Sequence, residues 1–205
     1  MKIVNILFFG FCSAFICTAQ VTLIGGACEG CEAIFENKTP FQNLTHELTL
    51  PTGHSNQTTL TITGTVYARD GKTPASDVIL YVYHTDQTGR YTANAGATGW
   101  EKRHGSIRGW LKTNKQGAYA IHTIMPAPYP SDDIAAHIHI FLKEPNKNPY
   151  WIEEYVFEGD PFLKSTDKNI HNPRGGSGLL KVEVKDHQQK ARRDIILGLN
   201  IPNYK

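Results

Sequence analysis

The segment Leu60-Thr61-Ile62-Thr63-Gly64-Thr65-Val66 places a threonine at every second position, between apolar residues and one glycine. A period of two is typical of a β-strand that buries one face in a core. Asp70-Gly71 follows as a turn signal, and residues 78–83 are β-branched and aromatic, as strand residues commonly are. This part of the chain therefore predicts two successive strands.

The same strand signals recur along the rest of the chain. Further segments with strand composition are residues 118–123, 137–142, 180–184 and 194–197. Short strands separated by loops of Gly, Pro and Asn predict an all-β fold, a β-sandwich of the immunoglobulin or prealbumin kind. We assign residues 58–205 to this sandwich and residues 20–57, which show little periodicity, to a loop-rich N-terminal extension.

The first residues have the pattern of a secretory signal peptide. Met1-Lys2 is followed by a short apolar run, and Cys17-Thr18-Ala19 carries small residues where a signal peptidase cuts. The alternative is a membrane anchor, but the run is shorter than the roughly 20 residues that cross a bilayer. Residues 1–19 are therefore interpreted as a signal peptide, which predicts a secreted or periplasmic protein that has no membrane association after cleavage.

Cleavage would leave Cys28 and Cys31 as the only cysteines of the mature chain. In an oxidising compartment this Cys-x-x-Cys pair is expected to form a local disulfide. A redox motif or half of a zinc site are the alternatives, but the sequence around the pair lacks both a βαβ pattern and two further nearby ligands.

Charge and composition exclude some classes of partner. The formal net charge is +2, and Lys and Arg are scattered rather than clustered. Nothing in this distribution indicates a nucleic-acid-binding surface. No sequence feature specifies an oligomeric state.

The densest group of metal-binding side chains is Pro128-Tyr129-Pro130 followed by His137-Ile138-His139. Because side chains alternate along a strand, His137 and His139 share one face of the predicted strand 137–142. Imidazole binds several transition metals, whereas a phenolate is a hard anionic donor that favours a trivalent ion. Tyr129 therefore points to ferric iron. The alternative is a strand whose histidines simply face water.

Four ordered blocks carry a resemblance to a known family. They are Asp86-Gln87-Thr88-Gly89-Arg90-Tyr91, Thr123-Ile124-Met125-Pro126-Ala127-Pro128-Tyr129-Pro130, His137-Ile138-His139 and Phe157-Glu158-Gly159-Asp160-Pro161. Together they resemble the intradiol ring-cleavage dioxygenases, the family of catechol and protocatechuate dioxygenases. The resemblance implies a β-sandwich enzyme, here a secreted one, that inserts O2 between the two hydroxyl-bearing carbons of a catechol. The product would be a cis,cis-muconate.

The resemblance assigns Tyr91, Tyr129, His137 and His139 as ligands of a non-haem Fe(III) ion. Two phenolates and a hydroxide would balance the charge of the ion, whose field lowers the pKa of a phenol from its ordinary value of about 10. The resemblance also gives both tyrosines a catalytic part. Tyr129 would leave the iron when the catechol binds, and Tyr91 would stay.

Two positions depart from the family pattern near the expected substrate site. An Arg found in many members three residues before the first His is Ile134 here, and a Gln three residues before the Phe-Glu-Gly-Asp block is Glu154. Losing a cation and gaining an anion favours an uncharged or bulky catechol over a carboxylated one. The cations that could compensate, each otherwise a solvated surface residue, are Arg90, Arg103 and Arg108.

Two other functions compete with the dioxygenase. One is a secreted, non-catalytic β-sandwich binding module of the transthyretin-like kind. The other is a copper or zinc protein in which His137 and His139 are joined by further histidines or carboxylates. The histidines available for this are His84, His104 and His122, each of which is more simply a strand or surface residue.

Overall fold

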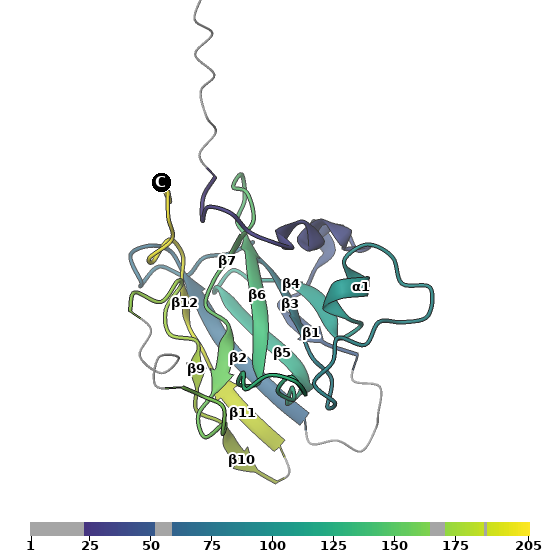
Figure 1. Cartoon of the computed structure of the whole chain (residues 1–205). Coiled ribbons are helices and arrows are strands. Elements are labelled where there is room, and N and C mark those ends of the chain that lie inside the picture. The colour runs from purple at the N-terminus through teal and green to yellow at the C-terminus, as the bar shows by residue number, and fades with distance from the viewer. Residues whose placement is uncertain (1–22, 52–58, 165–170, 187) are drawn as a thin grey trace, which may run out of the picture.

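The computed structural model describes residues 23–51, 59–164, 171–186 and 188–205. Within these residues, two six-stranded sheets stack on each other, which confirms the all-β sandwich (Figure 1). The first sheet has the order β1 (Glu47–Thr49), β5 (Ala118–Ile124), β2 (Thr59–Tyr67), β11 (Gln188–Arg192) and β10 (Glu183–Lys185), with β12 (Ile195–Ile196) paired to β2. The second has the order β4 (Arg108–Lys112), β3 (Ile79–His84), β6 (His137–Lys143), β8 (Tyr155–Phe157) and β9 (Leu179–Leu180), with β7 (Tyr150–Trp151) paired to β6.

The core between the sheets follows the predicted alternation. In β2, Leu60, Ile62 and Val66 are fully buried, whereas the threonines between them are partly exposed or exposed. In β6, Ile138 and Ile140 join the same buried cluster from the opposite sheet. The two inner faces therefore interlock as in other stacked sheets.

The outer face of the second sheet is covered as well. The helix η1 (Cys31–Glu36), of the 3-10 type, packs Ile34 against Tyr81, Tyr83 and Phe141 in a second, smaller core. Every residue of β3 is consequently buried. The extension expected to be loop-rich thus contributes η1, a second short helix η2 (Phe41–Asn43) and strand β1, which pairs with β5.

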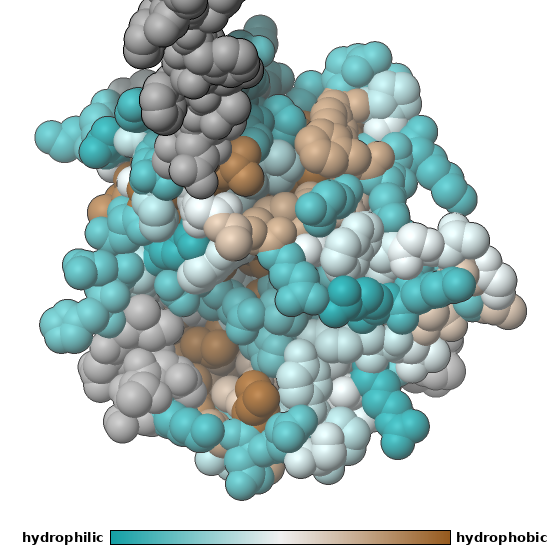
Figure 2. Space-filling view, turned by 45° about the horizontal axis from the view of Figure 1, so that its top comes forward, coloured by the Kyte–Doolittle hydropathy of each residue, from teal (hydrophilic) through white to brown (hydrophobic). Residues whose placement is uncertain are grey.

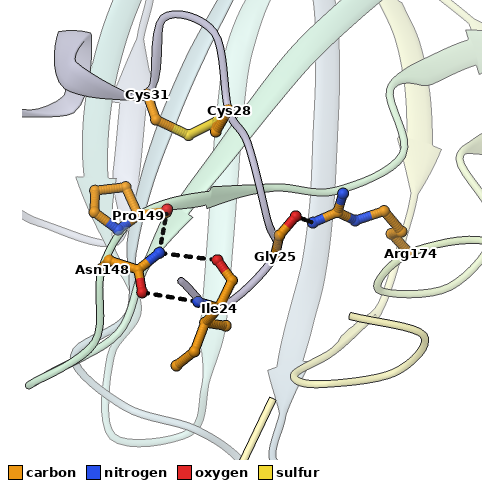
Figure 3. The surroundings of a disulfide bond; sticks show 7 residues. All are labelled: Ile24, Gly25, Cys28, Cys31, Asn148, Pro149 and Arg174. Atoms are coloured by element: carbon orange, nitrogen blue, oxygen red, sulfur yellow. Dashed lines mark hydrogen bonds between the residues drawn. A yellow bond between two sulfur atoms is a disulfide. The ribbon is translucent and has the colours of Figure 1, made fainter. Parts of the chain in front are cut away.

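Polar contacts tie the start of the described chain to the sandwich (Figure 3). The side chain of Asn148 accepts a hydrogen bond from Ile24 N at 3.1 Å and donates one to Ile24 O at 2.9 Å. The guanidinium of Arg174 donates to Gly25 O at 3.1 Å. Cys28 and Cys31 form a disulfide just beyond these contacts, at the start of η1. The extension is therefore held at several points along its length.

The strands near the C-terminus differ from the prediction. The single strand expected at residues 180–184 is divided between β9, which pairs with β8 in the second sheet, and β10, which pairs with β11 in the first. The strands β1, β4, β7, β8 and β11 were not predicted. In β4, Gly109 weakens the strand signal of the sequence. A glycine is needed at this position because a Cβ there would lie 2.7 Å from Leu48 of β1. In β11, the polar sequence is paired on both sides by β2 and β10, so tertiary pairing overrides low strand propensity.

Exposed apolar side chains are scattered over the described surface. Figure 2 shows a mostly hydrophilic face on which hydrophobic residues appear in separate patches. The large hydrophobic residues exposed among the described residues are Leu23, Phe35, Ile134, Trp151 and Val184. Single exposures of this kind are ordinary and mark no docking surface.

None of the helices in the described ranges has the length and apolarity needed to cross a bilayer. The predicted signal peptide, residues 1–19, lies outside those ranges. Secretion therefore stays a prediction.

The packing of the extension leads to a first test. Replacing Ile34, which has no exposed surface, with Ala is expected to lower the free energy of unfolding, by about 3 kcal/mol because a cavity opens in the outer core. Replacing its neighbour Phe35, which is 56% exposed, with Ala is the control, with an expected loss of under about 1 kcal/mol. Urea unfolding curves measure both. Equal, small losses would mean that the extension is a loose flap.

Candidate metal centre

His137 and His139 project from one face of β6, the face turned away from the core between the sheets. Ile138 and Ile140 point to the opposite face, as strand alternation predicts. His137 is only 7% exposed. A strand whose histidines face water, the alternative that the sequence left open, is therefore wrong for this pair.

Two tyrosines from different loops meet these histidines. The hydroxyl oxygens of Tyr91 and Tyr129 are 2.7 Å apart. The Tyr91 hydroxyl also lies 2.8 Å from Nε2 of His139, and the Tyr129 hydroxyl lies 3.1 Å from Nε2 of His137. The structure thus brings together all of the side chains that the resemblance names as ligands.

Asp86 shapes the turn that delivers Tyr91. Its Oδ1 accepts hydrogen bonds from the backbone N–H of Thr88 at 2.8 Å and of Arg90 at 3.2 Å, and its Oδ2 accepts one from the Thr92 hydroxyl at 2.5 Å. Burial opposes ionisation, but these hydrogen bonds keep the pKa of Asp86 below its ordinary value. The aspartate of the first sequence block is therefore a structural anchor.

Gly89 allows the two tyrosine loops to touch. Its φ is +73°, and a Cβ at this position would lie 2.0 Å from the carbonyl oxygen of Pro128. Only glycine meets both conditions without strain. Nearby, the Thr85 hydroxyl donates to Ala127 O at 2.7 Å. The loop of Tyr129 is thereby fastened to the end of β3, close to the loop of Tyr91.

Both imidazoles are held by the ring nitrogen that faces away from the tyrosines. Nδ1 of His137 donates to Ala135 O at 2.8 Å, and Nδ1 of His139 lies 2.6 Å from Oε1 of Glu154. With Nδ1–H engaged in this way, each Nε2 keeps a lone pair directed toward the tyrosine oxygens. Glu154, which the sequence marked only as a departure, therefore orients His139.

Asp160, from the fourth sequence block, anchors the start of β6. Its Oδ2 accepts from the backbone N–H of Ala136 at 3.1 Å, and its Oδ1 accepts from that of Phe162 at 2.9 Å. Ala136 directly precedes His137. This contact accounts for the Phe-Glu-Gly-Asp block without giving it a chemical role.

Burial favours the neutral forms of Tyr91, Tyr129 and His137 when the site holds no cation. Burial and the hydrogen bond to Tyr129 raise the pKa of Tyr91 well above its ordinary value, and burial also raises the pKa of Tyr129. Burial likewise lowers the pKa of His137. A metal ion that binds here must therefore displace phenol protons, so that binding releases protons and strengthens with pH.

The donor atoms fit a transition metal. Two neutral imidazole nitrogens and two ionisable phenol oxygens point toward one another, and each imidazole has the outer hydrogen bond that is usual for a metal ligand. Ligand atoms of His137, His139 and Glu154 also lie within 4.8 Å of one another. The latter set offers a competing arrangement, although Glu154 reaches His139 from the side opposite the tyrosines.

The other histidines considered from the sequence have partners elsewhere. The rings of His84, His104 and His122 hydrogen-bond to Thr123, Tyr81 and Thr61, respectively. His84 and His122 lie in strands, as expected. His104 is 6% exposed and lies in the short helix α1 (Glu101–His104), so the expectation that it is a strand or surface residue is wrong.

Of the arginines considered as compensating cations, Arg103 shares a cavity with the tyrosines. It lines a cavity of about 370 Å³ together with Tyr91, Tyr129 and His139, and it pairs with Glu29 at 2.7 Å. Arg108 instead pairs with Glu36 at 2.8 Å. Arg90 is exposed.

A second cavity, of about 350 Å³, lies on the His137 side of the cluster. Its apolar lining includes Ile134, Val156 and Leu179. The charged residues that line it are Asp133, Glu153, Glu154 and Lys164. Carboxylates thus outnumber cations among the lining residues that the structure describes.

The sequence can be assigned to a known protein family. The sequence matches a family model described as "Dioxygenase" over residues 32–175, which is more than half of the chain. The chain belongs to the intradiol ring-cleavage dioxygenase family. The family match confirms the resemblance carried by the four sequence blocks.

Solved structures share the fold of this dioxygenase. The dioxygenase domain of a dioxygenase carbohydrate-binding protein fusion from Streptomyces sp. SirexAA-E is 22% identical, with a TM-score of 0.55 over 78% of this chain and 94% of that one. The 3-chlorocatechol 1,2-dioxygenase of Rhodococcus opacus 1CP is 21% identical (TM-score 0.56, covering 73% and 63%). The catechol 1,2-dioxygenase of Pseudomonas arvilla C-1 is 16% identical (0.57, covering 74% and 56%). This chain thus spans less than two thirds of the length of the latter two.

The buried histidine His104 gives this dioxygenase a testable acid response. Burial lowers the pKa of His104 to about 4, from an ordinary value of 6.5. The unfolded chain therefore binds a proton that the folded chain refuses, so stability is full above pH 6.5 and falls as the pH drops toward 4.

Replacing His104 with Phe keeps a flat ring but removes this titration. Between pH 7 and pH 5 the variant is expected to lose about 2 kcal/mol less unfolding free energy than the wild type. Urea unfolding at both pH values measures the difference. Equal losses in the two proteins would show that His104 titrates normally in the fold.

Proposed function

We propose that this dioxygenase cleaves a catechol between its two hydroxyl-bearing carbons and holds Fe(III) through Tyr91, Tyr129, His137 and His139. The observation that carries the proposal is the meeting of two phenol oxygens with two imidazole Nε2 atoms whose Nδ1 atoms are engaged elsewhere. Family membership supports the reaction, and the solved relatives named as catechol and chlorocatechol dioxygenases support the substrate class.

The metal identity follows from the donor types. Two phenolates are hard, anionic ligands, and they favour Fe(III) over zinc or copper. When bound, Fe(III) would supply Lewis-acid activation of the catechol toward O2. Little water reaches the His137 imidazole, which is 7% exposed.

The side chains of the centre would handle protons and position. A catechol that binds through both oxygens gives up two protons. The Tyr129 phenolate oxygen would take one of them, and a hydroxide at the site would take the other. Each tyrosine contacts the other and one imidazole, but Tyr91 also packs against Tyr83 and the outer core, so it is the tyrosine better held in place. Glu154 and Ala135 O keep the two imidazoles aimed at the substrate side.

The overall reaction balances without another reactant. The ring bond between the two hydroxyl-bearing carbons and the O–O bond both break, and each of these carbons gains one oxygen atom. Every atom of the catechol and of O2 ends in the cis,cis-muconic acid. No external reductant is required.

The cavity on the His137 side fits the ring of an uncharged catechol. Ile134, Val156 and Leu179 give it an apolar wall, and its described carboxylates are unfavourable to a carboxylated ring. An Arg that would pair with a substrate carboxylate is absent at position 134. We therefore favour neutral catechols over protocatechuate.

We further propose that the protein acts outside the cytoplasm. The signal-like residues 1–19 support this location, as does the Cys28–Cys31 disulfide, since disulfides persist in oxidising compartments. Environmental phenols would then be accessible substrates.

A copper or zinc site is the second candidate. The observation that favours it is the carboxylate of Glu154 beside His137 and His139. In such a site, Tyr91 and Tyr129 would not be metal ligands. Replacing Glu154 with Gln separates the two: a Glu154-ligated site would lose its metal, whereas the tyrosine-ligated site keeps iron with weaker affinity.

A substrate panel under ¹⁸O2 tests the proposed function. With catechol and its methyl-substituted derivatives, we expect a muconate-type product that carries both labelled oxygen atoms. Methylcatechols should exceed protocatechuate in kcat/KM by about tenfold, the effect of roughly 1.4 kcal/mol of charge repulsion. Absence of ring cleavage would refute the function, and a preference for protocatechuate would refute only the substrate assignment.

A further inference from the structure

Tyr83 lies between two nearly parallel imidazole rings. Its ring centroid is 4.4 Å from that of His139, with an interplanar angle of 17°. On its other side the centroid of His104 is 3.8 Å away, with an angle of 8°. The three rings form a continuous stack, His139–Tyr83–His104, that ends at a candidate metal ligand.

Strand pairing sets one half of this stack. Tyr83 of β3 is directly opposite His139 of β6 in the antiparallel register. Side chains that face each other across such a pair are close enough to pack ring on ring. The contact is therefore built into the sheet.

The disulfide segment, residues 28–31, and α1 fix His104 on the other side of Tyr83. Nδ1 of His104 lies 2.9 Å from the hydroxyl of Tyr81, which fixes the ring edge. Gly30, between Cys28 and Cys31, lies so close to His104 that a Cβ there would come within 3.0 Å of its ring. His104 therefore has little room to move away from Tyr83.

Without Tyr83, only in-plane hydrogen bonds would hold the ring of His139. Glu154 holds its Nδ1 and the Tyr91 hydroxyl contacts its Nε2, and both partners act at the edge of the ring. Because hydrogen bonds tolerate some bending and the terminal torsion of a histidine is broad, these two contacts resist tilting of the ring plane only weakly. A contact against the face of the ring is what stops the tilt.

We infer that Tyr83 is a positioning residue, which fixes the plane of the His139 imidazole so that its Nε2 lone pair points at the metal. This inference rests on the proposed function, in which His139 is a metal ligand. The role belongs to the ring of Tyr83. Its hydroxyl is not needed, and burial raises the pKa of Tyr83 well above the ordinary value, so the side chain stays a neutral phenol.

Leu and Phe substitutions separate the ring from the hydroxyl. Tyr83→Leu removes the flat face and is expected to weaken iron affinity about 10- to 100-fold, as loss of an outer contact to a ligand typically does. Tyr83→Phe keeps the ring and should stay within about twofold of the wild type in affinity. Competition with a chelator measures the affinities, and the visible charge-transfer band reports the ligand geometry.

Tyr150→Leu is the matched control. Tyr150 is 1% exposed and belongs to the main core, where it hydrogen-bonds to Glu144. Its loss should destabilise the fold comparably without changing iron affinity. Wild-type affinity in Tyr83→Leu, or an equal loss of affinity in Tyr150→Leu, would overturn the inference.

A measurement on the metal-free protein keeps the inference distinct from the proposed function. The order parameter of the His139 Cε1–H bond, from ¹³C relaxation, should report a rigid ring in the wild type and in Tyr83→Phe, and a more mobile ring in Tyr83→Leu. A wild type that never takes up iron would sink the proposed function alone, and these order parameters would then decide the positioning role. An unchanged His139 order parameter in Tyr83→Leu would refute it.

Discussion

The antiparallel register between β3 and β6 is the constraint on which the candidate metal centre depends. It sets Tyr83 opposite His139 and buries both faces of the sheet. Ile138 and Ile140 hold one face in the main core, while Tyr81 and Tyr83 hold the other under the extension. A slip of one residue would turn both histidines into the core, so burial on two faces specifies where the imidazoles point.

Around that register, the polar atoms of the centre are satisfied by one another. Each described imidazole nitrogen of His137 and His139 has a partner, as do both tyrosine hydroxyls. A buried polar cluster of this kind is tolerable because its groups are hydrogen-bonded. It also prepares the site for a cation, because the lone pairs already converge and the ion would replace hydrogen bonds between the phenols and the imidazoles. The same atoms therefore contribute to the stability of the metal-free protein and to its affinity for metal.

The strands with clear alternation and the family-like ligand positions were predictable from the sequence. The side chains that support the site were not, because their roles depend on contacts between distant segments. Asp160 is part of a sequence motif, yet its carboxylate accepts a hydrogen bond from Ala136 N, 24 residues earlier in the chain. In the sequence, Glu154 was only a replacement for a Gln of the family pattern. In the structure, its carboxylate contacts Nδ1 of His139 and orients that ring. The polar β11 carries no strand signal of its own, and the stack on His104 requires the disulfide segment to fold over the sheet.

The most direct test of the account is a visible spectrum of the purified protein, taken with metal analysis, before and after catechol is added without oxygen. We expect about one iron per chain, a tyrosinate-to-Fe(III) charge-transfer band and a shift of that band when catechol binds. A colourless protein that holds zinc or copper, or that takes up no iron on reconstitution, would contradict the ligand set of Tyr91, Tyr129, His137 and His139.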